Sequence, residues 1–186
     1  MPEPRVPPNQ TVTRLFPVLH FGPVPRVALD RWRFRVFGLV RRPLEFSWEE
    51  MLQLRPKTVR ADIHCVTGWS KLDTEWEGID PQAVLEVAEP LPEARYVMVH
   101  GMNQFTANLE LDDILAPDTV LAHRFAGAPL AAEHGGPMRL VVPHRYFWKS
   151  AKWVTGFELM AEDRPGFWEE RGYHLRGDPW QEERYW

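Results

Sequence analysis

Cys65 is the only cysteine in this chain of 186 residues, and it limits how the fold can be held together. One cysteine cannot form an intramolecular disulfide, nor can it alone build a Cys-rich zinc site or an iron–sulfur cluster. The fold must therefore rest on a hydrophobic core, which a single domain of this length can bury. If Cys65 binds a metal, most of the ligands must come from elsewhere, and a cofactor that brings its own sulfur or nitrogen ligands is the natural source.

The charge of the chain excludes one broad class of function. A formal net charge of −4 argues against a general nucleic-acid binder, because a non-specific grip on phosphates needs a basic face. No run approaches the ~20 apolar residues of a membrane span. The first 25 residues contain several prolines and lack the apolar stretch of a signal peptide, so we expect a cytoplasmic protein with no transmembrane segment.

The pattern along the chain predicts one α+β domain over residues 1–186, with many short strands and few short helices. Residues 1–30 are interrupted by prolines and predict an irregular arm, and the aromatic tail 162–186 is expected to pack back on the domain. Predicted strands cover residues 31–40, 58–66, 95–101, 119–125 and 153–159, and a further short buried strand follows the Gly-Gly-Pro loop at 135–137. Predicted helices cover 47–56, which begins with a Ser-x-x-Glu capping box, and 80–90, which begins with Asp-Pro.

Cys65 lies at the end of the predicted strand 58–66, where a side chain can be presented by a loop on a rigid support. A free cysteine is most often a small buried apolar residue. A nucleophilic Cys–His pair is a second interpretation, but neighbouring side chains in a strand point to opposite faces, so His64 is a poor base for Cys65. A metal ligand is the third interpretation.

A second cluster of chemical interest occupies residues 133–153. Its Gly-Gly loop offers main-chain N–H groups to an anion, and several cations follow within a short stretch, which suits a phosphate-bearing ligand. A solvated basic face is the alternative interpretation. The cations are Arg139, Arg145, Lys149 and Lys152. No P-loop and no G-x-G-x-x-G motif is present, so a standard nucleotide site is not expected.

Three blocks in this order, "HCVTGWS", "YVMVHG" and "HGGPMRLVVPHRYFWKSAKWV", resemble the molybdopterin-binding domain of the sulfite oxidase family. The resemblance is closest to the bacterial branch that includes the catalytic subunit of the periplasmic methionine sulfoxide reductase. It implies the mixed-sheet fold of that family and one molybdenum held by one pyranopterin, with Cys65 as the single protein ligand and catalytic residue. The other cofactor contacts that it implies are Phe16, Leu19, His20, Gly101, His134, Arg139, Ser150, Ala151 and Lys152.

The resemblance further implies oxygen-atom transfer to or from a small sulfoxide-like or sulfite-like substrate, with an external electron-transfer partner. The animal and plant sulfite oxidases carry an Asn-Arg pair shortly after the ligand cysteine, whereas residues 66–70 here read "VTGWS", which puts sulfite in doubt. Two alternatives stay open at this point: a non-catalytic domain that keeps the fold, and a thiol enzyme that uses Cys65 as a nucleophile. Candidate pocket walls, weighed against a core role, are Trp69, Tyr146 and Trp148.

Overall fold

Two mixed β-sheets and three short α-helices form the computed structural model, which describes residues 4–186. Residues 1–3 of the predicted arm lie outside the described part. The first sheet contains β1 (Thr11–Val12), β4 (Pro56–His64), β5 (Trp69–Ile79), β8 (Val120–Phe125), β9 (Ala128–Pro129) and β10 (Arg139–Val141). The second sheet has the order β3 (Leu44–Ser47), β2 (Arg33–Gly38), β11 (Val154–Met160), β6 (Tyr96–Gly101) and β7 (Thr106–Glu110). The predicted α+β class with short helices is confirmed.

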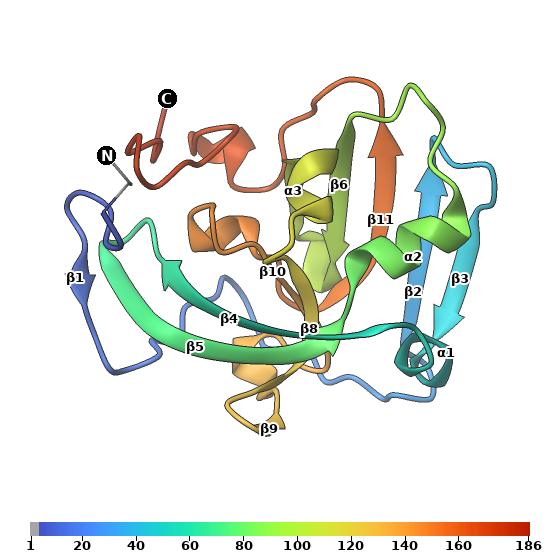
Figure 1. The fold of residues 1–186 in the computed structure, drawn as a ribbon, viewed down its shortest axis with the longest axis horizontal. Coiled ribbons are helices and arrows are strands. Elements are labelled where there is room, and N and C mark those ends of the chain that lie inside the picture. The colour runs from blue at the N-terminus through green and yellow to red at the C-terminus, as the bar shows by residue number, and fades with distance from the viewer. Residues whose placement is uncertain (1–3) are drawn as a thin grey trace.

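The strand β2 shows how the sequence sets the second sheet. Its residues alternate between exposed arginines and buried Phe34 and Val36, as the pattern of arginine and apolar residues predicts. Each fully buried side chain of this kind contributes about 1.5–3 kcal/mol. In Figure 1, β2 lies between β3 and β11, with the helix α2 (Pro81–Ala88) in front of the sheet. Val84 of α2 and Leu121 of β8 belong to the same hydrophobic cluster as Phe34, so one core joins both sheets.

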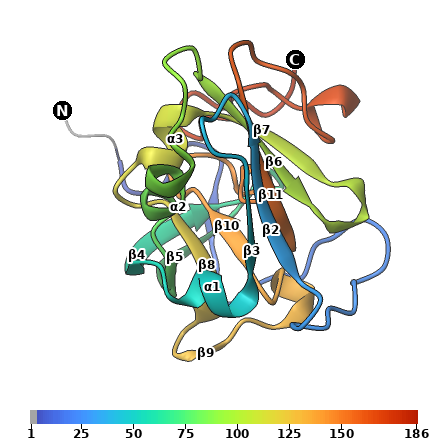
Figure 2. The ribbon, with the colours of Figure 1, turned by 90° about the vertical axis from the view of Figure 1, so that its right-hand side faces the viewer.

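The helices begin where the sequence predicts. Ser47 caps α1 (Trp48–Leu52), its Oγ accepting from the Glu50 amide at 3.2 Å while its own amide donates to the Glu50 carboxylate at 2.7 Å. Asp80 caps α2, and its carboxylate accepts from the Gln82 amide at 3.1 Å. The short helix α3 (Leu111–Leu115) precedes β8. Figure 2 shows α1, α2 and α3 on one side of the second sheet. No helix among residues 4–186 is long and apolar enough to cross a membrane.

The longest strand, β5, was not predicted. It pairs along most of its length with β4, and the two form the long curved band in Figure 1. Two of its buried positions hold Ser70 and Thr74 rather than apolar residues, so the strand lacks the alternation of a half-buried strand. Hydrogen bonds satisfy both hydroxyls, since Thr74 Oγ1 donates to the Ala61 carbonyl and Ser70 Oγ contacts His64. The turn between β4 and β5 begins at Cys65, so this hairpin positions the cysteine.

Candidate active site

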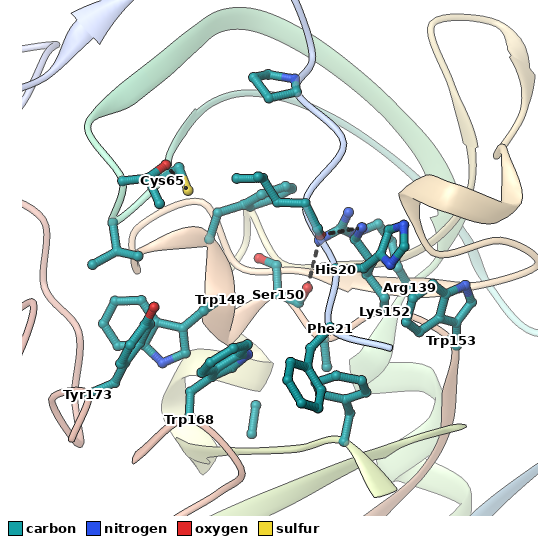
Figure 3. A pocket seen from close by; sticks show the side chains of 18 of the residues that line it. His20, Phe21, Cys65, Arg139, Trp148, Ser150, Lys152, Trp153, Trp168 and Tyr173 are labelled. Atoms are coloured by element: carbon teal, nitrogen blue, oxygen red, sulfur yellow. Dashed lines mark hydrogen bonds between the residues drawn. The ribbon is translucent and has the colours of Figure 1, made fainter. Parts of the chain in front are cut away.

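A cavity of about 320 Å³ opens between the N-terminal arm, the turn after β4, the segment 139–153 and the C-terminal tail. Figure 3 shows the side chains around it, with Cys65 at one end and Arg139, Lys152 and His20 at the other. We call these the thiol end and the cationic end. None of the described residues that line the cavity is an aspartate or glutamate. The lining residues are Phe16, Pro17, Leu19, His20, Phe21, Cys65, Val66, Thr67, Trp69, Phe105, Thr106, Ala107, Arg139, Phe147, Trp148, Ser150, Ala151, Lys152, Trp153, Trp168 and Tyr173.

Cys65 directly follows β4 and opens the tight turn to β5, as the sequence predicts. Its amide donates to the Trp69 carbonyl at 2.8 Å and its carbonyl accepts from the Gly68 amide at 3.0 Å. Gly68 has φ +99, a left-handed conformation that favours glycine. Burial raises the pKa of the Cys65 thiol, and a hydrogen bond from Thr67 Oγ1 at 3.1 Å offsets this only in part. A thiol of this kind is a poor free nucleophile, which argues against the thiol-enzyme alternative.

His64 faces away from Cys65, as strand geometry predicts. Its Nδ1 lies 2.7 Å from Ser70 Oγ, and His64 lines a second cavity together with Trp180 and His144. Burial lowers the pKa of His64 to about 4, so the imidazole is neutral at physiological pH. His64 is therefore neither a base nor a cation for the thiol end.

The cationic end contains two cations whose hydrogen bonds within residues 4–186 all go to main-chain carbonyls. The Arg139 guanidinium, whose residue is 1% exposed, donates to the carbonyls of His134 at 2.8 Å and Ser150 at 2.6 Å. Lys152 Nζ donates to the carbonyls of Leu19 at 2.8 Å and Glu133 at 2.6 Å. Burial lowers the pKa of Arg139 to about 9, and burial together with Arg139 lowers that of Lys152 to about 7. Arg139, which is buried, and Lys152, which is half-buried, have no carboxylate partner among residues 4–186, and together they form a site that an anion would complete.

The glycine loop beside these cations leaves no room for side chains. Gly135 has φ +109, and a Cβ there would lie 3.0 Å from the Lys152 side chain and 3.1 Å from Arg139 Cβ. Next to it, His134 stacks on Phe16 with ring centroids 3.9 Å apart, and its Nδ1 is buried without a partner in the structure. Burial, Lys152 and Arg139 all lower the pKa of His134. This end of the cavity thus offers positive charge, and the unpartnered imidazole nitrogen of His134 lies behind Phe16 rather than in the cavity.

Two of the four cations in the predicted anion cluster do not face the cavity. Arg145 is bound to Asp113, with Nη2 2.8 Å from Oδ1. Lys149 forms a fully buried pair with Glu169, Nζ to Oε1 at 2.6 Å. Carboxylates in the interior hold both of these cations. The cluster seen in the sequence therefore contains fewer cations available to a ligand than predicted, namely Arg139 and Lys152.

The structure brings most of the ten predicted site residues together. Eight line the cavity, namely Phe16, Leu19, His20, Cys65, Arg139, Ser150, Ala151 and Lys152. Gly101 and His134 do not line it. Gly101 ends β6 beside the Lys152 carbonyl, and His134 packs behind Phe16. Contact of any of the ten with a cofactor stays a prediction.

Of the candidate wall residues, Trp69 and Trp148 line the cavity, whereas Tyr146 is fully buried and does not. The tail residues Trp168 and Tyr173 were not predicted as part of the site. The only signal for them in the sequence is the number of aromatic residues in a tail without periodicity. Among residues 4–186, no group of three His, Cys, Asp or Glu side chains could hold a metal ion. A metal at Cys65 would therefore have to bring most of its own ligands.

Comparison with known proteins gives three findings. The model of the oxidoreductase molybdopterin binding domain family matches residues 21–168. The oxidoreductase YuiH of Bacillus subtilis is 50% identical over 182 residues, which are 97% of this chain and 92% of YuiH. The protein-methionine-sulfoxide reductase catalytic subunit MsrP of Gluconobacter oxydans is 28% identical over 86% of this chain and 56% of MsrP.

A solved structure shares the fold. The sulfane dehydrogenase SoxCD from Paracoccus pantotrophus superposes with a TM-score of 0.71 at 23% identity, covering 77% of this chain and 41% of the SoxCD chain. At this identity the likeness concerns the fold alone. The chain spans little more than half of MsrP and less than half of that SoxCD chain, so it corresponds to one part of each.

Proposed function

The chain belongs to the oxidoreductase molybdopterin-binding domain family, and we propose that it removes the oxygen atom from small neutral S-oxides or N-oxides. The family and its oxidoreductase relatives establish a molybdopterin-dependent oxidoreductase whose chemistry is oxygen-atom transfer. The direction of transfer and the class of substrate are the proposal. The proposal rests on one observation: the lone thiol and the cations of the cavity lie at opposite ends.

The residues present fit the cofactor of this family. A pyranopterin with a terminal phosphate requires a cationic partner at one end and, at the metal, one soft protein ligand besides its own two sulfurs. Arg139 and Lys152 are cations with no carboxylate partner, and Cys65 is the one thiol of the cavity. When bound, the cofactor supplies a molybdenum that cycles between Mo(VI) and Mo(IV). Cys65 would hold the metal, and Arg139 and Lys152 would hold the phosphate.

The surroundings of Cys65 indicate a neutral substrate. Its neighbours in the cavity are Val66, Thr67, Trp69, Trp148 and Tyr173, and none of these carries a charge. Sulfite is an anion and would need a cation that faces the cavity near the thiol. Arg184 is close enough to lower the pKa of Cys65, but it donates to the Val66 carbonyl and does not line the cavity. The cations that do line it lie at the other end, where the cofactor phosphate would neutralise them. A sulfoxide or N-oxide is neutral and has apolar groups that suit aromatic walls. The relatives named as methionine-sulfoxide reductases also favour an S-oxide.

The chain's own groups have assignable tasks in this reaction. Thr67 Oγ1 donates a hydrogen bond to Cys65 Sγ, which fixes the sulfur and tunes the potential of a metal bound to it. The aromatic residues around Cys65 exclude water from the reacting atoms. Burial raises the pKa of Tyr173, so its hydroxyl stays protonated at neutral pH and can donate to a substrate oxygen.

Electrons must come from outside the chain in this proposal. Removal of the oxygen as water consumes two electrons and two protons, and the described residues provide no second redox group. We therefore include an external electron-transfer partner. A cytoplasmic location is also part of the proposal, and fractionation of cells that express the natural protein would check it.

The decisive assay uses the full chain loaded with molybdenum cofactor. We expect reduced methyl viologen to be oxidised with dimethyl sulfoxide or trimethylamine N-oxide as acceptor, and much slower reduction of ferricyanide by sulfite. Cys65→Ser, purified alongside, should show neither activity. Sulfite oxidation that exceeds sulfoxide reduction would overturn the proposal.

A further inference from the structure

The thiol end of the cavity has a wall that comes partly from outside the matched family region. Trp168 is the last residue that the family model matches and Tyr173 lies beyond it, yet both line the cavity beside Trp148. Tyr173 stacks on Trp168 with centroids 5.1 Å apart at 25°, and its ring meets Trp148 edge-on at 5.1 Å and 85°. Figure 3 shows the three rings below Cys65. We call Trp148, Trp168 and Tyr173 the aromatic wall.

A buried ion pair fixes the aromatic wall to the domain. The side chains of Lys149 and Glu169 are both 0% exposed, with Nζ 2.6 Å from Oε1. The same Oε1 accepts from Trp148 Nε1 at 2.8 Å, so one carboxylate oxygen joins the indole of Trp148 to the tail. Lys149 Nζ also donates to the carbonyl and the side-chain oxygen of Asn108, both at 2.9 Å. Glu169 therefore sets where Trp148 and Trp168 stand relative to each other.

Burying the Lys149–Glu169 pair is unfavourable, so the pair does more than fill space in the interior. Glu169 Oε2 is buried without a partner in the structure, and Gly166 leaves it only narrow space, since a Cβ there would lie 2.8 Å away. Burial also lowers the pKa of Lys149, and Glu169 offsets that effect. Apolar residues of similar volume often serve stability as well as a buried pair or better. What the pair supplies here is a fixed position for two indoles beside Cys65.

We propose that the aromatic wall selects S-oxides with an aromatic substituent on the sulfur, with Trp168 and Tyr173 as specificity-determining residues and Glu169 as the positioning residue. This rests on the proposed function. The reaction is R–S(=O)–CH3 + 2 H⁺ + 2 e⁻ → R–S–CH3 + H2O: the S–O bond breaks, sulfur is reduced, and the external donor is oxidised. A planar substituent would meet ring faces and edges, which favour it over a methyl group.

The test compares two sulfoxides on the molybdenum-loaded full chain with reduced methyl viologen as donor. For the ratio of kcat/KM for methyl phenyl sulfoxide to that for dimethyl sulfoxide, we expect a value above about 10 in the parent protein, or about 1.4 kcal/mol, and a fall of about tenfold in Trp168→Ala. Tyr173→Leu should lower the ratio similarly, whereas Tyr173→Phe, which keeps the ring, should retain it. Trp180→Ala removes a half-buried tail aromatic that donates to the Pro4 carbonyl and does not line the cavity, and it is the matched control.

Binding provides a readout that does not depend on turnover. Methyl phenyl sulfide, the product, should quench tryptophan fluorescence of the oxidised, loaded protein, and its Kd should rise about tenfold in Trp168→Ala. A ratio and a Kd that stay unchanged in Trp168→Ala and Tyr173→Leu would overturn the inference. If the parent reduces both sulfoxides without preference, the wall inference fails and the proposed function stands. If sulfite is the better substrate, the proposed function fails, and the sulfide Kd still decides whether the wall recognises an aryl group.

The positioning role of Glu169 needs its own variants. Glu169→Gln keeps the volume and an acceptor for Trp148 but removes the charge, and the combined Lys149→Met and Glu169→Leu variant removes both charges if the single one does not fold. In either folded variant the loss should appear as a raised KM for methyl phenyl sulfoxide, of about threefold to tenfold, rather than as a lowered kcat. A purely structural role would lower the melting temperature and leave that KM unchanged, which would contradict the assignment.

Discussion

The two ends of the cavity are held in different ways. At the cationic end, Arg139 and Lys152 donate to main-chain carbonyls, nearly all of them within residues 133–152. At the thiol end, Cys65 stands on a turn of the first sheet, and its wall comes from η3 (Phe147–Lys149) and from the tail. Both cations of the cationic end thus come from one local segment, which the arm meets at Leu19 and His20, whereas the thiol end is assembled from three distant segments. This division suits an enzyme in which cofactor binding is constant and substrate choice can vary with the tail.

The largest expected effect comes from replacing the thiol at one end of the cavity, and anion binding then shows whether the other end still works. Cys65→Ser should lower sulfoxide reduction by more than about 1,000-fold, since even partners of metal ligands cost about 10–100-fold when removed. Molybdenum content by elemental analysis should fall with it. The cationic end should be unaffected, so inorganic pyrophosphate should raise the melting temperature of cofactor-free Cys65→Ser as much as that of the parent. Loss of that shift would show that the two ends are not independent.

The buried pair behind the aromatic wall gives the next largest effect. Glu169→Gln leaves Lys149 in the interior without its counter-charge, and breaking a buried pair costs about 3–5 kcal/mol of unfolding free energy. Urea unfolding of the cofactor-free protein measures this loss. The exposed pair of Arg35 and Glu45 is the matched control, because Glu45→Gln should cost less than about 1 kcal/mol. Equal losses in the two variants would contradict the special role of the pair.

The same division explains what the sequence could predict. The glycines and both cations of the cationic end lie within one stretch, so they could be identified as an anion cluster, although Arg145 and Lys149 in that cluster bind interior carboxylates. The position of Cys65 at a strand end was also predictable. The positions of Trp168 and Tyr173 in the cavity could not be predicted. These residues lie more than 90 residues after Cys65 in the sequence, and no local pattern connects the tail to that part of the cavity. Their placement depends on Glu169 meeting Lys149, a long-range contact.

Lys152 tests the cationic end alone. Lys152→Met should weaken pyrophosphate binding to the cofactor-free protein by about 10–100-fold, the effect of removing a charge-assisted hydrogen bond. Because the pKa of Lys152 is about 7, an anion meets a charged lysine below that pH. The pyrophosphate-induced rise in melting temperature should therefore be larger at pH 6 than at pH 8, where Arg139 is still charged, in the parent, and this difference should be much smaller in Lys152→Met. Lys71→Met, at a half-buried lysine that also donates to a main-chain carbonyl but does not line the cavity, should behave like the parent.

The smallest expected effect is the pH dependence of the unfolding free energy that His144 causes, in the segment between Arg139 and η3. His144 precedes η3 and sits between Asp113 Oδ1 at 2.8 Å and Asp118 Oδ1 at 3.2 Å. Burial alone would lower the pKa of His144, but these carboxylates raise it to about 9, above its usual 6.5. The folded chain therefore binds a proton that the unfolded chain releases between these values. Its stabilisation is complete below about pH 6.5 and is lost as the pH rises through about 9.

The depressed pKa of Lys152 acts in the opposite sense over an overlapping range, because above about pH 7 the unfolded chain binds the extra proton and stability rises with pH. The two contributions must be separated, and Lys152→Met provides the background. In that background, we expect unfolding free energy to fall by about 1–3 kcal/mol from pH 6 to pH 8.5, a range that stays below the pKa of about 9 of Arg139, and adding His144→Gln should remove most of the fall. Urea unfolding at the two pH values measures both. If the unfolding free energy still falls without His144, another group causes the pH dependence, and the segment between the two ends does not respond to pH through His144.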